Sequence, residues 1–218
     1  MKGFWWKTTG VILVLYSIIS GFLIEVPALP ILNETIRNLF FHVTMWFSMM
    51  ILMTLSIINS IKFLSGSGLK CDLFASQEAG IGMFFGTMGL ITGMVWAYYT
   101  WGDWWVNDPK LNGAVVTMLV YAAYFVLRGS LEDPIKKAKV SAVYNIFAYT
   151  MLIVFIMILP RMTDSLHPGN GGNPGFNTYD VDKNMRIVFY PAIIGWTLIG
   201  IWMTNLKVRY MQIKHIDG

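Results

Sequence analysis

Residues 38–61 read NLFFHVTMWFSMMILMTLSIINSI, a run of 24 residues without Asp, Glu, Lys or Arg. A helix rises about 1.5 Å per residue and needs roughly 20 predominantly apolar residues to cross the hydrocarbon core of a bilayer. This stretch is therefore long enough to span a membrane as a helix. A spanning helix also satisfies its backbone hydrogen bonds internally, as lipid requires.

The same absence of charge recurs in five other stretches: Thr8–Ile24, Ala79–Gly102, Leu111–Leu127, Val140–Pro160 and Ile187–Leu206. The composition agrees, because 56% of the residues are hydrophobic and only 13% are charged, whereas soluble domains carry about 25% charged residues. A soluble globule is thereby excluded. We predict an all-α membrane protein in which residues 1–218 form a single domain, a bundle of six transmembrane helices in a lipid bilayer.

The third stretch has features that predict its start and its packing. Ser76 is expected to be its N-cap, with Glu78 in its first turn, where a carboxylate suits the helix dipole. Small residues let membrane helices approach closely. We therefore expect close packing along the glycines of this helix, which are Gly80, Gly82, Gly86, Gly89 and Gly93.

The positive charges are divided unequally between the two sides of such a bundle. Eleven of the 16 Lys and Arg residues lie at the N-terminus, in segments 62–78 and 128–139, and after Leu206. The positive-inside rule then predicts that both termini are cytoplasmic. The topology explains the net charge of +4, so nothing in the chain favours a nucleic-acid partner.

The tryptophans cluster on the predicted outer side, between the third and fourth helices. Four of the nine, Trp96, Trp101, Trp104 and Trp105, lie within ten consecutive residues. If residues 101–108 are helical, three indoles and Asp108 share one face, at i, i+3, i+4 and i+7. A belt of interfacial aromatic residues also accounts for their number. It does not account for this order, which favours a shelf for a large planar ligand such as a porphyrin.

Two of the three histidines lie on the same predicted side as this shelf. His42 is at the outer end of the second helix, and His167 follows the fifth helix, just before a glycine-rich segment. We expect both to be axial ligands of a porphyrin iron that is held transiently, although isolated interfacial histidines are often only hydrogen-bonded. His215 lies in the predicted cytoplasmic tail and is assigned no role.

Two further residue types bear on the same ligand. Arg37 and Arg161 are the cations nearest in sequence to the two histidines, and they are candidates for binding porphyrin carboxylates. Arginines at helix ends also commonly extend to lipid headgroups. Cys71 is the only cysteine, so a porphyrin cannot be attached through a CxxCH motif.

The segment Trp101-Gly102-Asp103-Trp104-Trp105-Val106-Asn107-Asp108-Pro109 resembles the WWD signature of haem-handling proteins of cytochrome c maturation. The resemblance extends from about Arg37 to Leu206 and points to the haem exporter protein C (CcmC) family. The other residues that carry it are Arg37, His42-Val43, Trp46, Thr92-Gly93, Trp96 and Leu166-His167. The chain departs from the family pattern at Asn107, Lys110 and Pro168.

The resemblance implies a function and a set of partners. In that family a periplasmic WWD segment, residues 101–110 here, is flanked by two histidines that ligate haem, and His42 and His167 take those positions. The cofactor is then haem b, held transiently through bis-histidine iron. The implied partners are the periplasmic haem chaperone CcmE, the ABC transporter subunits CcmA and CcmB, and the small protein CcmD. The implied location is the bacterial inner membrane, as a multi-pass protein.

Two other functions remain open at this stage. A b-type cytochrome subunit for electron transfer needs permanently ligated haem, usually between histidines within helices, and only His42 is near a span. A transporter permease for haem or another solute needs polar groups along a path, and the six stretches contain no charged residue. We therefore predict a haem-binding assembly factor that is not an enzyme and has no catalytic residue.

Overall fold

The computed structural model describes residues 3–28, 32–167 and 181–214. Six helical spans in this part are long and apolar enough to cross a membrane, which confirms the predicted six-helix membrane bundle. The long helices are α1 (Phe4–Leu23), α2 (His42–Lys62), α3 (Leu69–Trp101), α4 (Pro109–Gly129), α5 (Pro134–Leu152) and α7 (Lys183–Lys214). Short helical segments extend them: η1 (Asn33–Phe40) and η2 (Phe63–Ser67) flank α2, and η3 (Ile153–Ile158) and α6 (Leu159–Met162) continue α5.

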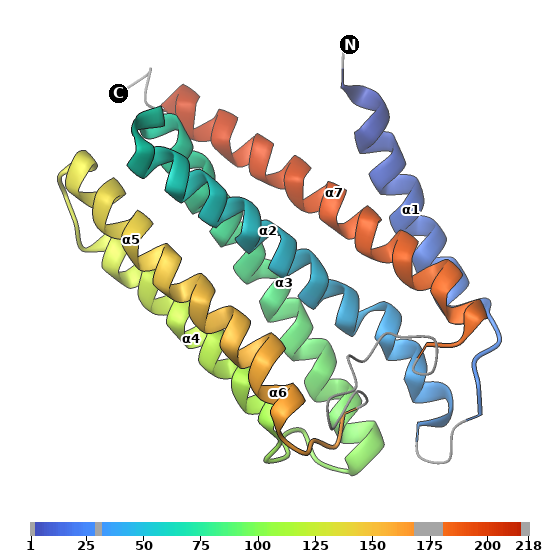
Figure 1. Cartoon of the computed structure of the whole chain (residues 1–218). Coiled ribbons are helices and arrows are strands. Elements are labelled where there is room, and N and C mark those ends of the chain that lie inside the picture. Colours follow the sequence, from blue (N-terminus) through green and yellow to red (C-terminus); the bar gives the residue numbers. More distant parts are fainter. Residues whose placement is uncertain (1–2, 29–31, 168–180, 215–218) are drawn as a thin grey trace.

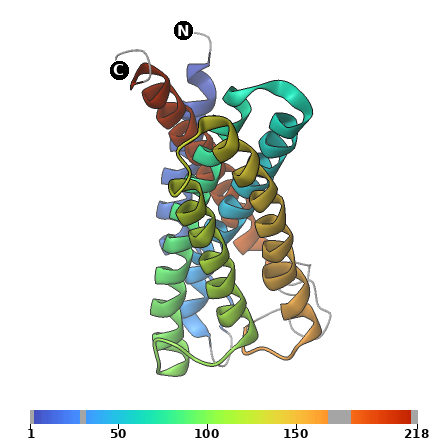
Figure 2. The same ribbon diagram turned by 90° about the vertical axis from the view of Figure 1, so that its left-hand side faces the viewer.

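The long helices form three pairs, and α2 has neighbours in all three of them (Figures 1 and 2). α2 lies along α3 and also contacts α5 and α7, while α1 packs on α7 and α4 packs on α5. The start of α1 and the end of α7 lie at the same end of the bundle, as an even number of crossings requires. The assignment of that end to the cytoplasm stays a prediction from the charges.

The predicted start of the third helix is wrong. α3 begins at Leu69, so Ser76 is not an N-cap and instead donates to the carbonyl of Leu73 within the helix. The acidic residues Asp72 and Glu78 of α3 both have partners on neighbouring helices. Both carboxylate oxygens of Glu78 accept hydrogen bonds from the amide of Asn59 on α2.

Four of the five glycines in α3 lie in close contact with neighbouring helices. A Cβ on Gly82 would lie 2.8 Å from Met53, and one on Gly86 would lie 2.5 Å from the sulfur of Met118. Gly89 and Gly93 are equally crowded by side chains of α2, whereas the nearest atom to a Cβ on Gly80 is 3.9 Å away. The expected close packing therefore holds for the stripe from Gly82 onward, and it brings α2 and α3 together.

A proline in α7 is compensated by α1. Pro191 lies inside α7 and has no N–H, so the carbonyl of Ile187, four residues earlier, lacks its helical partner. The hydroxyl of Tyr16 on α1 donates to this carbonyl oxygen at 3.2 Å. Because lipid offers no hydrogen bond to a bare carbonyl, this contact stabilises the α1–α7 pair.

A buried ion pair joins α3 to the last turn of α4. Two nitrogens of the Arg128 guanidinium each donate to one oxygen of Asp72, both at 2.7 Å. Both side chains are more than four-fifths buried. Such a pair is costly to break, because removing one partner leaves the other charged and unpaired.

We expect Asp72→Ala to lower the free energy of unfolding by about 3 to 5 kcal/mol, the usual effect of leaving a buried charge without its partner. Unfolding of the purified protein by SDS in mixed micelles measures the change. The double variant Asp72→Ala/Arg128→Met removes both charges and should recover most of the loss. A double variant as unstable as the two single losses added together would contradict this interpretation.

Candidate functional site

The structure brings four of the residues singled out from the sequence to one end of the bundle, here called the histidine end. His42 is the first residue of α2, Trp96 and Trp101 belong to the last turns of α3, and His167 follows α6. The rings of Trp96, Trp101 and His167 contact one another, with centroids 4.9 to 5.4 Å apart. Residues far apart in the chain thus form one aromatic cluster.

His42 is fixed against α3 by a hydrogen bond to Gly89 and by close packing of its ring on Gly93, which has no side chain. Its Nδ1 lies 2.8 Å from the carbonyl oxygen of Gly89. Since a carbonyl only accepts, Nδ1 carries the proton, and Nε2 is left with its lone pair as a potential metal ligand. The ring lies over Gly93, where an added Cβ would be 2.6 Å from Cε1 of His42.

Trp96 links the two histidines. Its ring lies 6.4 Å from that of His42, in a nearly parallel stack, and 5.4 Å from that of His167. No contact between the rings of His42 and His167 occurs in the part of the chain that the structure describes. Both imidazoles are therefore on the same side of the bundle, next to one shared indole.

Asp108 ties the segment after α3 to the segment after α6. It is the N-cap of α4, where its Oδ1 accepts from the backbone N–H of Lys110 at 2.9 Å, and it is 1% exposed. Its Oδ2 accepts from the backbone N–H of Leu166 at 2.7 Å, and its Oδ1 lies 3.0 Å from Nδ1 of His167. Asp108 thus places His167 beside the start of α4.

The surroundings of Asp108 favour its ionised form. Burial by itself raises the pKa of this carboxyl, but the contacts with His167, Ser165 and Leu166 outweigh burial and hold the pKa well below its usual range. The ionised carboxylate therefore stabilises the fold in full above about pH 4, the ordinary value for Asp. This contribution is lost only as the pH falls further, toward the lowered pKa.

The predicted helical shelf is wrong in its geometry. α3 ends at Trp101 because Gly102 takes a left-handed conformation, φ +84°, which terminates a helix, and α4 begins only at Pro109. Trp104 stacks on Tyr98, with ring centroids 4.7 Å apart, and is half exposed. Trp105 is partly buried in the same connecting segment.

The two arginines are engaged in helix-end contacts. Arg37 donates to the carbonyl oxygens of Gly21 and Ile24 at the end of α1 and pairs with Glu34. Arg161 donates to the carbonyl oxygen of Met157, one turn earlier. Their binding of carboxylates stays a prediction. The glycine-rich segment after His167 and the tail with His215 lie outside the described residues.

Three residues that support the site were not assigned to it from the sequence. Gly89 provides the acceptor for His42, Gly93 provides the space for its ring, and Leu166 provides a donor to Asp108. The glycines were expected only to help helices pack. Their spacing of four residues in α3 places both on the face that meets His42, and this signal was present in the sequence.

We expect Asp108→Ala to lower the free energy of unfolding by about 2 to 4 kcal/mol, since it removes a helix cap and leaves a buried donor unpaired. Asp133→Ala is the matched control, because Asp133 caps α5 before a proline in the same way, accepting from Lys136. It should cost only about 1 kcal/mol. Denaturation in micelles measures both losses of stability. If Asp108→Ala and Asp133→Ala lost the same free energy of unfolding, Asp108 would not join the segment after α3 to the segment after α6.

Comparison with known proteins agrees with this arrangement. The model of a family described as Heme exporter protein C matches residues 2–216. The Heme exporter protein C of Rhodobacter capsulatus is 24% identical over 223 aligned residues, covering 98% of this chain and 89% of that protein. The protein of the same name from Bradyrhizobium diazoefficiens is 30% identical over 178 residues, covering 81% of this chain and 66% of that protein.

A second group of relatives matches over a shorter length. The cytochrome c biogenesis protein CcsA of Prochlorococcus marinus is 34% identical over 105 residues, which cover 48% of this chain and 33% of that protein. The match to the first family spans nearly the whole chain, and the six spans make it a multi-pass membrane protein. This chain therefore belongs to the Heme exporter protein C (CcmC) family.

Proposed function

We propose that this protein binds haem at the histidine end, with the iron between His42 and His167, and delivers it to a periplasmic haem chaperone of the CcmE kind. Haem is then the cargo, and the protein acts as an assembly factor in cytochrome c maturation and not as an enzyme. The observation that carries the proposal is the convergence of two distant histidines on one indole, Trp96.

The chemistry of the site suits iron in a macrocycle. A metal ion bound by protein alone needs three or four ligating side chains, whereas porphyrin iron already has its pyrrole nitrogens and accepts two axial ligands. His42 donates its Nδ1 proton to a carbonyl, which leaves Nε2 for the iron. Nδ1 of His167 lies 3.0 Å from Oδ1 of Asp108, and in this proposal its Nε2 is the second ligand. Trp96 and Trp101 supply flat apolar surface beside them.

The two ligands differ in how they are held. His42 is locked in a rigid helix over Gly93, whereas His167 lies in a connecting segment and is placed by Asp108. A carboxylate next to a ligating imidazole orients the ring and raises its basicity. Release of haem then requires movement of the connecting segment alone, which suits transient binding.

Membership of the family supports the proposed partners and location. The relatives named Heme exporter protein C support haem as the cargo. The resemblance adds the ABC transporter subunits CcmA and CcmB, the small protein CcmD and the bacterial inner membrane. The WWD segment, residues 101–110, then faces the periplasm, where the chaperone receives haem.

We expect His42→Ala and His167→Ala each to abolish the bis-histidine haem spectrum and to weaken haem binding by about 10-fold or more, because each removes one axial ligand. Absorption spectra of the purified full-length protein titrated with ferric haem measure both effects. His215→Ala is the control and should behave as the unmodified protein does. A bis-histidine signal retained in either of the first two variants would overturn the proposal.

The same preparation separates the alternatives. Stable haem that cycles between oxidation states with quinol would favour an electron-transfer cytochrome. Uptake of haem or another solute by vesicles that contain this chain alone would favour a permease. Transfer of haem from the protein to a purified CcmE-like chaperone, lost in His167→Ala, is the outcome expected here.

Gly93→Ala should lower haem affinity by about tenfold or more, because the new methyl displaces the His42 ring from its place against α3. Alanine favours a helix by about 0.5 to 1 kcal/mol over glycine, so α3 itself is not weakened. Gly80→Ala, on the same helix but with the nearest atom to its Cβ 3.9 Å away, is the matched control and should bind haem normally. Equal affinities of the two variants would show that Gly93 does not position His42.

A further inference from the structure

The indole N–H of Trp96 is a buried donor without an acceptor. Trp96 is 9% exposed, and its Nε1 makes no hydrogen bond. Several other buried atoms share this condition. Hydroxyls such as those of Ser48 and Thr197 can rotate toward a carbonyl of their own helix, and Nδ1 of His167 lies 3.0 Å from Oδ1 of Asp108. An indole N–H points in one direction fixed by the ring.

The position of this donor makes it informative. A buried donor left unpaired costs free energy, so native proteins nearly always give it a partner. The ring that carries it contacts His42, Trp101 and His167. An acceptor on the bound ligand would pair with the Nε1–H of Trp96, next to the two histidines that bind the ligand.

We propose that Nε1 of Trp96 donates a hydrogen bond to a carboxylate on the rim of the bound macrocycle. This inference rests on the proposed function. If two histidines ligate the iron, no axial position is left for an oxygen atom that could accept from Trp96. The pyrrole nitrogens are bound to the iron, so the rim carboxylates are the acceptors that remain on haem b. Trp96 then selects porphyrins that carry free carboxylates, beyond offering them a flat surface.

One of the two arginines predicted for this task, Arg37, has its guanidinium directed to other groups. Arg37 directs its guanidinium to the carbonyls at the end of α1 and to Glu34. Trp96, by contrast, contacts both imidazoles and has its N–H unused. Trp96 is therefore better placed than Arg37 to donate to such a carboxylate.

The test compares two iron porphyrins in the full-length protein in lipid nanodiscs. Ferric protoporphyrin IX carries two rim carboxylates, and ferric octaethylporphyrin carries only ethyl groups. We expect the unmodified protein to prefer the first, and Trp96→Phe to reduce that preference by about 10- to 100-fold, the worth of a hydrogen bond to a charged group. Affinity for octaethylporphyrin should change little, because the phenyl ring retains most of the apolar contact.

Trp46→Phe is the matched control. Trp46 also contacts the His42 ring, edge-on at 6.4 Å, but it does not contact His167, and the variant should keep the full preference. An unchanged preference in Trp96→Phe, or an equal loss of affinity for both porphyrins, would overturn the inference. If Trp96→Phe does not fold, the isosteric analogue β-(benzothiophen-3-yl)alanine at position 96 replaces the N–H by sulfur and gives the same test.

The histidine variants show which proposal has failed. If His42→Ala and His167→Ala bind both porphyrins as the unmodified protein does, the proposed haem site itself is wrong. If they lose binding while Trp96→Phe keeps its preference, haem binds there and only the role of the indole N–H is wrong.

Discussion

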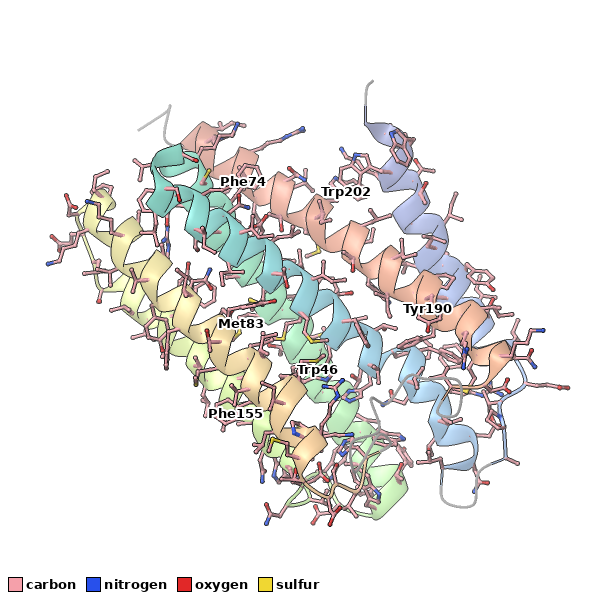
Figure 3. All side chains as sticks on the ribbon, viewed as in Figure 1. Trp46, Phe74, Met83, Phe155, Tyr190 and Trp202 are labelled. Carbon is pink, nitrogen blue, oxygen red and sulfur yellow. The ribbon has the colours of Figure 1, made fainter. Side chains whose placement is uncertain are left out.

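The close approach of α2 to α3 is the contact on which the rest of the structure depends. It is possible because α3 presents glycines on the face that meets α2, and the side chains of α2 occupy the space that Cβ atoms would fill. Trp46, labelled in Figure 3, lies against Gly89, and His42 lies one turn farther along, over Gly93. The same packing that stabilises the bundle in lipid therefore also places and orients the first histidine.

The second histidine is placed by a different kind of interaction. His167 is held at the histidine end by a carboxylate that also begins α4, so the fold of one helix and the position of one ring depend on Asp108. Helix α4 is in turn fixed at its far end by the pair of Asp72 and Arg128. Within this site, helix packing holds His42, whereas the hydrogen bonds and charge of Asp108 hold His167.

Much of this arrangement could be predicted from the sequence, and the failures have physical reasons. Lipid requires long uncharged helices, so the six spans were visible, and the scarcity of histidine singled out His42 and His167. The start of α3 was missed because the turns before Ser76 contain Asp72, and its pairing with Arg128 of α4 depends on which helices are neighbours, which one sequence does not show. The predicted third stretch ended at Gly102, next to the observed end of α3 at Trp101, but the helical face over residues 101–108 was wrong because the spacing of the tryptophans also fits a helix.

The proline in α7 has a consequence for the first helix. An ordinary residue at position 191 would donate to the carbonyl of Ile187 itself, so that carbonyl would not depend on Tyr16 for a partner. The missing N–H therefore gives α1 a preferred position on α7, because sliding by one turn would separate the hydroxyl of Tyr16 from the carbonyl of Ile187. The hydrogen bond that α7 cannot make at Pro191 thus helps to set the position of α1 along its axis.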